Sequence, residues 1–214
     1  METSPFEPAG DAAQTPRLAV RQLQSAHAGP VTLALGRGEC VAIVGESGSG
    51  KSVLLRMIAD LIPNDGSVLL DGAARETWPA PAWRAMVVYQ AAEPAWWEAS
   101  AAQHLAPAGL AAAEALAREL KLRPGALQAD LALMSTGERQ RLALIRSLAG
   151  RPRVLLLDEP ASALDAASSA ALEAVLRAEM EQGLAILIVT HSEQQAARLG
   201  RRRLRMAHGR LEPA

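Results

Sequence analysis

The residues with the clearest chemical potential form a glycine-rich segment between two apolar stretches. Residues 45–52 read G-x-x-x-x-G-K-S, an apolar run over residues 40–44 precedes them, and apolar residues at helical spacing follow as far as residue 61. A strand, a glycine loop and a helix in this order form the context in which such a motif binds phosphate. The loop consists of Gly45, Glu46, Ser47, Gly48, Ser49, Gly50, Lys51 and Ser52.

Each part of this loop suits a polyphosphate. Glycine lets successive backbone N–H groups turn toward an anion without Cβ clashes, and the N-terminus of the next helix adds partial positive charge. Lys51 supplies a full charge to the β- and γ-phosphates of a nucleotide, and the Ser52 hydroxyl is a ligand for Mg²⁺. A glycine-rich turn without a ligand is the competing interpretation, and the complete motif in its context favours phosphate binding.

Polar residues also end other apolar runs. Asp158 follows four apolar residues, so we expect its carboxylate to meet Mg²⁺ directly or through water. Strand side chains alternate, so Glu159 points elsewhere and is placed to polarise an attacking water. We expect Gln90 to touch the metal and the water through its amide oxygen, and His191 to donate a hydrogen bond to the γ-phosphate. An isolated glutamine or histidine at a strand end is more often structural, and only the set supports these two roles.

The apolar patterns predict how these residues are brought together. Strand-length apolar runs alternate with helical segments, which predicts an α/β fold with a parallel sheet covered by helices on both faces. Two alternating stretches, residues 18–23 and 31–35, predict an antiparallel layer beside it. Ligands bind at the carboxyl ends of the strands in such sheets. Further expectations are a disordered tail at 1–16, a turn at 64–66, an alanine-rich helical insertion at 91–130 with a helix at 111–122, and helices at 135–149 and 166–181.

Bulk properties narrow the function classes. The chain has 214 residues and a formal net charge of −1, so no general attraction to nucleic acid or anionic lipid is expected. The single cysteine, Cys40, cannot form an internal disulfide and is expected to be buried. No apolar run approaches the roughly 20 residues needed to span a bilayer, and the N-terminus lacks a secretory signal. We therefore expect a cytoplasmic chain that reaches a membrane only through a partner.

The order of these motifs resembles the ATPase subunit of ATP-binding-cassette (ABC) transporters. The resemblance covers residues 17–214 and implies a P-loop NTPase with a RecA-like parallel core, an N-terminal antiparallel β layer and a helical subdomain at about 91–134. It implies ATP and Mg²⁺ as cofactors, with Glu159 as general base and Lys51 as the main charge stabiliser. The motifs are GESGSGKS (45–52), Gln90, MSTGERQR (134–141), VLLLDEP (154–160), SALD (162–165) and VTH (189–191).

The same resemblance implies a two-copy arrangement and a membrane partner. Two copies would pair head to tail, with each ATP between the phosphate loop of one copy and Ser135, Gly137 and Glu138 of the other. Asp165 would lie in the loop that links the two sites. An integral membrane permease subunit would dock on the helical subdomain and hold the chain at the inner face of the cell membrane. No nucleic-acid partner is implied.

Three features depart from that pattern or leave it open. Thr136 stands where glycine is usual, which would reduce affinity or rate if the backbone there needs positive φ or close contact with phosphate, and would be tolerated otherwise. His27 falls where the family places an adenine-stacking aromatic, but the segment from His27 to Gly38 is short, and an ordinary exposed loop histidine is the alternative. Trp96 and Trp97, if they share one helix, cannot both face its core side, which favours a groove for the permease over two core residues.

Two other functions remain to be separated from transport. One is a soluble ATPase of the same superfamily that acts on nucleic acid or ribosomes. The other is a nucleotide-gated binding module that hydrolyses poorly because of Thr136. Residues 92–98 and 138–146 are also similar to small bacterial ATPases of the iron-export or metal-homeostasis type.

Overall fold

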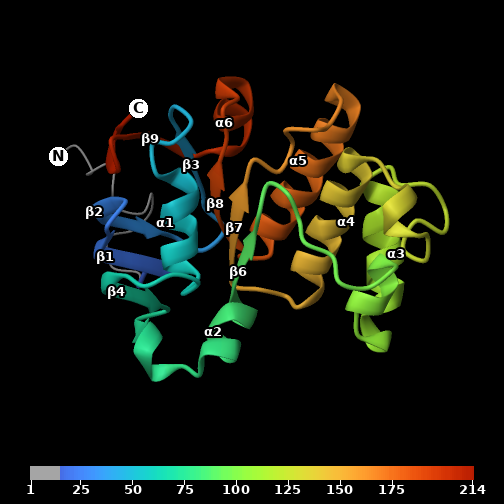
Figure 1. Ribbon diagram of the computed structural model, residues 1–214, viewed down its shortest axis with the longest axis horizontal. Helices are drawn as coiled ribbons and strands as arrows, with labels where there is room; N and C mark the ends of the chain where they lie inside the picture. Colours follow the sequence, from blue (N-terminus) through green and yellow to red (C-terminus); the bar gives the residue numbers. More distant parts are fainter. Residues whose placement is uncertain (1–14) are drawn as a thin grey trace.

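Six strands form the central sheet of the computed structural model, which describes residues 15–214 (Figure 1). In spatial order they are β10 (Arg210–Pro213), β9 (Arg202–Ala207), β3 (Cys40–Val44), β8 (Ala185–Val189), β7 (Val154–Asp158) and β6 (Val87–Gln90). Every neighbouring pair runs parallel except β9 and β10, which form a hairpin. All residues of β3, β7 and β8 are buried, as their uninterrupted apolar runs predict. The predicted α/β fold with a parallel core is confirmed.

A second sheet holds the N-terminal strands. Its order is β2 (Ala28–Leu35), β1 (Leu18–Ser25), β4 (Asp65–Leu70) and β5 (Ala73–Ala74), all antiparallel. The turn expected at residues 64–66 is wrong, because Asp65 already pairs with Gln24 inside β4. Gly66 has a φ of 100° and lies against the Gln22 backbone where the register shifts, so the Asp-Gly signal marks a bulge.

The central sheet separates two apolar layers because side chains alternate along its strands. Val41 and Ile43 of β3 face the layer that contains the second sheet, α1 (Lys51–Ile58) and α2 (Ala80–Met86). Ala42 and Val44 face the layer that contains the other helices. These are α3 (Leu110–Glu119), α4 (Thr136–Ala149), α5 (Ala166–Glu181) and α6 (Glu193–Leu199). Figure 1 shows the two groups on opposite sides of the sheet.

The segment predicted as a helical insertion is less regular than expected. Residues 91–100 have no helix, α3 begins at Leu110, and short 3₁₀ turns cover residues 101–104, 107–109 and 131–133. Trp96 and Trp97 therefore lie in a loop, and the argument that placed them on one helix is wrong. Pro94 and Pro107 remove backbone donors that a continuous helix would need.

Two further expectations concern the N-terminal tail and helices that could span a membrane. The tail predicted at residues 1–16 lies outside the described residues except for Thr15 and Pro16, which have no regular structure. Within residues 15–214, no helix combines the length and apolar content that a membrane crossing requires.

Candidate functional site

The phosphate loop joins the end of β3 to the start of α1. Gly45, Gly48 and Gly50 have φ values of 147°, 79° and 103°, which side chains with a Cβ rarely adopt. No side chain caps the N-terminus of α1, and the buried Ser49 hydroxyl makes no hydrogen bond within the described chain. Unpaired backbone donors, an orphaned hydroxyl and a helix N-terminus together suit an oxyanion.

Lys51 is held inside this loop. Its side chain is 6% exposed, and Nζ donates to the carbonyl oxygens of Gly45 and Glu46, both at 2.7 Å. Burial lowers the pKa of Lys51, while the negative charges of Glu159 and Asp158 oppose that shift. The ammonium group thus lies within electrostatic reach of both carboxylates, as the sequence predicts for a common site.

Two segments contact the phosphate loop: the hairpin formed by β9 and β10, and the start of β2. Gly45 runs so close to the carbonyl oxygen of Met206 that any Cβ there would clash. In the hairpin between β9 and β10, the N–H of Gly209 donates to the Ser49 carbonyl at 3.0 Å. A Cβ added at Gly50 would lie 3.2 Å from the Ala28 side chain, in the strand that follows the turn containing His27. His27 is exposed beside the loop, and its contact with adenine stays a prediction.

Asp158 ends β7 on the α1 side of the sheet. Its residue is 5% exposed, and Oδ2 accepts a hydrogen bond from the Tyr89 hydroxyl at 3.0 Å. No other described side chain donates to this carboxylate. Burial raises the pKa of Tyr89 to about 12, and the neighbouring Asp158 adds to the rise. The Tyr89 hydroxyl therefore stays protonated and can donate this hydrogen bond. The sequence analysis did not identify Tyr89, because at the end of this strand it considered only Gln90.

Glu159 and His191 meet at the ends of β7 and β8. The His191 backbone N–H donates to Oε2 of Glu159 at 3.2 Å, and the ring Nε2 lies 3.1 Å from Oε1. Burial raises the pKa of Glu159, against the opposing effects of His191 and Lys51. Glu159 also has a φ of 48°, a strained conformation fixed by its backbone hydrogen bond to Val189 at 2.9 Å. A raised carboxyl pKa and an orienting histidine are properties of a general base.

Gln90 points to the other side of the sheet. It is 4% exposed, its Oε1 accepts from the Ser147 hydroxyl at 3.2 Å, and its Nε2 lies 3.5 Å from the Gln140 carbonyl. Because adjacent strand residues face opposite ways, Tyr89 reaches Asp158 while Gln90 reaches α4. The structure therefore does not bring Gln90 to the phosphate loop, and its metal-binding role stays a prediction.

The segment from Ser135 to Glu138 begins α4 with a capping box. The Glu138 N–H donates to Ser135 Oγ at 3.2 Å, and the Glu138 carboxylate accepts from the Ser135 N–H at 2.9 Å. These hydrogen bonds lower the pKa of Glu138. Thr136 is the first helical residue and lacks positive φ, so its backbone holds the side chain without strain. Its effect on contact with phosphate stays a prediction. Within residues 15–214, no hydrogen bond or ion pair joins this segment to the phosphate loop.

Gln140 of α4 links two loops in the interior, a role that sequence reasoning missed. It is 2% exposed, and its Nε2 donates to the Ala92 carbonyl at 3.1 Å and to Ser162 Oγ at 3.0 Å. The N–H of Ala163 donates to its Oε1 at 3.3 Å. The same loop ends at Asp165, which caps α5 by accepting from the Ser168 N–H at 2.7 Å, a contact that lowers the pKa of Asp165.

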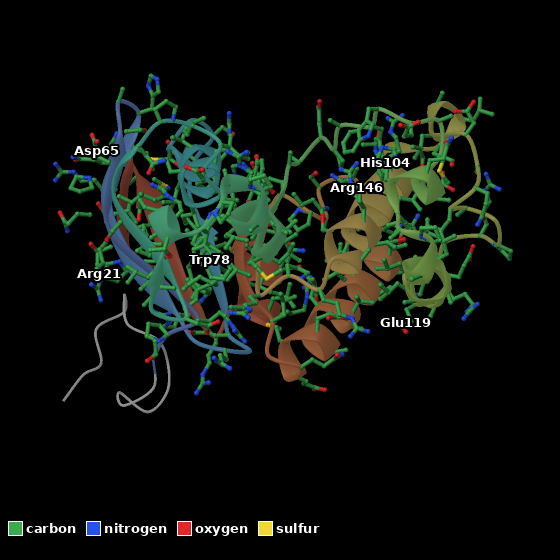
Figure 2. All side chains as sticks on the ribbon, turned by 90° about the horizontal axis from the view of Figure 1, so that it is seen from below. Arg21, Asp65, Trp78, His104, Glu119 and Arg146 are labelled. Atoms are coloured by element: carbon green, nitrogen blue, oxygen red, sulfur yellow. The ribbon has the colours of Figure 1, made fainter. Side chains whose placement is uncertain are left out.

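The two adjacent tryptophans lie over α4. Arg146 approaches both indole rings, 4.2 Å from the centroid of Trp96 and 5.2 Å from that of Trp97, and donates to the Ala95 carbonyl at 2.8 Å. His104 meets both rings edge-on, and Figure 2 shows it beside Arg146. Trp96 is partly buried against the core, whereas Trp97 is 72% exposed. Trp96 therefore packs at the edge of the core, and Trp97 lies on the surface.

The parallel core and its phosphate loop define a P-loop nucleotide-binding protein, and the comparisons with known proteins give the family. The model of the ABC transporter family matches residues 28–162, so the chain belongs to that family. The chain is similar to the lipoprotein-releasing system ATP-binding protein LolD of Bordetella avium (strain 197N), with 40% identity over 210 residues and 86% of each chain covered.

Other relatives agree on the family and differ in what they transport. The aliphatic sulfonates import ATP-binding protein SsuB of Burkholderia pseudomallei (strain K96243) is 37% identical over 209 residues, which cover 95% of this chain. The chain spans only 62% of that relative's length. A solved dimeric ATP-binding cassette with ADP and Pi shares the fold, with a TM-score of 0.79, 21% identity, and 92% and 98% of the two chains covered. The similarity to iron-export ATPases stays a prediction.

Proposed function

We propose that this chain binds ATP with Mg²⁺ and hydrolyses it as the ATPase subunit of an ABC transporter. The observation that carries the proposal is the convergence of Lys51, Asp158, Glu159 and His191 at the carboxyl ends of β3, β7 and β8. Family membership and the ATP-binding proteins among its relatives support the choice of nucleotide.

The residues fit Mg²⁺ that arrives with a nucleotide. Asp158 offers a buried carboxylate beside Lys51, and Ser52 opens α1 with its hydroxyl. Among residues 15–214, no cluster of three histidine, cysteine or acidic side chains forms a metal site by itself. Hence phosphate oxygens and water would have to complete the coordination, as is usual for this ion. When bound, Mg²⁺ neutralises charge on the phosphates.

The reaction assigned to these residues is direct hydrolysis. Glu159 accepts a proton from water as the water oxygen attacks the γ-phosphorus, and the bond from that phosphorus to the bridging oxygen of ADP breaks. Lys51 stabilises the charge on the transferred phosphoryl group, and His191 holds Glu159 through the two contacts described above. The raised pKa of Glu159 makes it a better proton acceptor than an exposed carboxylate.

A second copy would complete each site. Ser135 and the start of α4 are exposed, and a hydroxyl at a helix N-terminus is a second phosphate-binding surface. Gly137 lies so close to the Ala163 carbonyl that a Cβ would approach it to 2.8 Å, which ties this surface to the loop ending at Asp165. Head-to-tail pairing would place this surface across from the phosphate loop of the partner copy.

A membrane permease is the proposed recipient of the motion. Trp97 and Leu133 are exposed, at 72% and 84%, on the segment between β6 and α4. A groove of about 590 Å³ lies next to them, lined by Pro94, Trp96 and Arg139 among other residues. An apolar anchor beside a groove fits a short helix of an integral membrane protein. This arrangement would hold the chain at the inner membrane face, with ATP-driven closure moving the permease.

Two experiments test these steps. The first measures nucleotide-dependent dimerisation by analytical ultracentrifugation: Lys51→Ala should abolish it, and dimerisation unchanged by that substitution counts against the proposal. The second isolates the chain from detergent-solubilised membranes. Recovery with an integral membrane protein supports the transporter role, whereas recovery only with ribosomes or nucleic acid favours the soluble alternative.

A further inference from the structure

We propose that Tyr89 is a positioning residue for Asp158 and sets how tightly the nucleotide site holds Mg²⁺. The inference rests on the proposed function, since it concerns the metal that accompanies the nucleotide. Its starting observation is the 3.0 Å hydrogen bond from the Tyr89 hydroxyl to Oδ2 of Asp158.

Strand geometry fixes which residue reaches the carboxylate. Tyr89 and Gln90 are the last residues of β6, which pairs in parallel with β7, and they face opposite sides of the sheet. The Tyr89 ring packs against the apolar layer that contains α1, and Gln90 is held by Ser147 on α4. Tyr89 is therefore the side chain that β6 presents to Asp158.

Asp158 depends on this single donor. The carboxylate is almost fully buried, and within the described chain no second side chain donates to it, so Oδ1 has no hydrogen-bond partner there. A buried carboxylate costs free energy unless it is hydrogen-bonded, so this donor favours the orientation in which Oδ2 meets the Tyr89 hydroxyl. Tyr89 occupies Oδ2 and leaves Oδ1 as the oxygen with free acceptor capacity. Donors of this kind orient metal-binding carboxylates in other proteins.

The remaining charges around the pair are consistent with this role. Arg56, one helical turn beyond Ser52, donates from Nε to the Ser52 carbonyl at 3.2 Å and also lies near the Tyr89 hydroxyl. Lys51 lies within electrostatic reach of the Asp158 carboxylate. Tyr89 thus links β6 to the side of α1 from which the Ser52 hydroxyl would bind the metal.

The test is the Mg²⁺ dependence of ADP binding, measured by calorimetry on the full chain. In Tyr89→Phe, which keeps the ring and removes the hydroxyl, ADP affinity in EDTA should equal that of the wild type. The Mg²⁺ concentration that half-saturates the affinity gain should rise about 10-fold or more, the usual effect of removing such a donor. An unchanged Mg²⁺ midpoint in Tyr89→Phe overturns the inference.

A double-mutant cycle separates positioning from a general packing effect. In an Asp158→Asn background, which removes the charge that the hydroxyl orients, Tyr89→Phe should have no further effect on the Mg²⁺ midpoint. An equal shift in both backgrounds overturns the positioning role. Val88→Ala provides the matched comparison, because Val88 lies in the same strand but packs on the opposite face of the sheet, away from Asp158, and should leave the midpoint unchanged. An equal shift in Val88→Ala would assign the effect to strand packing and overturn the positioning role.

The failure of this inference differs from the failure of the proposed function. A wild type that binds ADP with no dependence on Mg²⁺, or binds no nucleotide, overturns both. A wild type with Mg²⁺-dependent binding and a Tyr89→Phe variant identical to it overturns the inference alone.

Discussion

Replacing Gln140 with alanine should be among the most destabilising polar substitutions in the chain. Gln140 is 2% exposed and makes three hydrogen bonds, to Ala92, Ser162 and Ala163, at 3.1, 3.0 and 3.3 Å. Each such bond contributes about 1 kcal/mol net, so Gln140→Ala should lower the free energy of unfolding by about 3 kcal/mol. For a chain of this size that corresponds to a fall in Tm of about 6–12 °C.

The assay is urea unfolding followed by tryptophan fluorescence, with Gln128→Ala as the control. Gln128 is exposed and makes a single hydrogen bond, to Glu114 at 3.0 Å, so its removal should change stability by less than about 0.5 kcal/mol. The reasoning is refuted if the two alanine variants unfold at the same urea concentration, because the buried junction would then contribute no more than a surface contact.

Two further predictions concern buried groups. Cys40 is 2% exposed, and burial, followed by the charge of Glu39, raises its pKa to about 12. The native thiol is then almost entirely protonated at mildly alkaline pH, so it should not react with Ellman's reagent there and should react fully once unfolded. Rapid reaction in the native state would contradict this burial. Trp83 is fully buried and its Nε1 donates to the Ile58 carbonyl at 3.1 Å, so Trp83→Phe should cost about 2–3 kcal/mol in thermal unfolding, and a neutral substitution would contradict the assigned hydrogen bond.

The elements of the core follow directly from its sequence pattern. The apolar runs before Gly45, Asp158 and His191 can be buried on both faces only in the middle of a sheet, which is where β3, β7 and β8 lie. Prediction from neighbouring residues fails where the local structure is set by pairing with a strand distant in the sequence. Asp65 and Gly66 have the composition of a turn, yet they form a bulge because β4 pairs with β1.

The same limit applies to the site. The phosphate loop is a local motif, so its residues could be named from spacing alone. The tyrosine beside Gln90 has no motif of its own, and its contact with Asp158 depends on β6 lying next to β7, which joins residues 69 positions apart. Side-chain alternation could have identified Tyr89 once the pairing of β6 with β7 was known, because alternation places Tyr89 and Gln90 on opposite faces of the sheet.

Helix prediction failed near the tryptophans for a related reason. Alanine-rich composition favours helix over residues 91–110, but residues 91–100 have no helix and only short 3₁₀ turns precede α3. Arg146 holds this segment by contacting both indole rings and the Ala95 carbonyl. Tertiary contacts of this kind outweigh intrinsic propensity, which amounts to less than about 1 kcal/mol per residue.

The central claim is that Glu159 accepts the proton from the attacking water during ATP hydrolysis, and steady-state phosphate release tests it most directly. Glu159→Gln should lower kcat by about 100- to 10,000-fold while leaving ATP binding intact, because the amide cannot accept that proton. The control is Glu114→Gln on the surface of α3, which should retain wild-type turnover. Phosphate release by Glu159→Gln at the wild-type rate, or its absence from the wild type in the presence of Mg²⁺ and dimer-forming protein concentrations, would contradict the account.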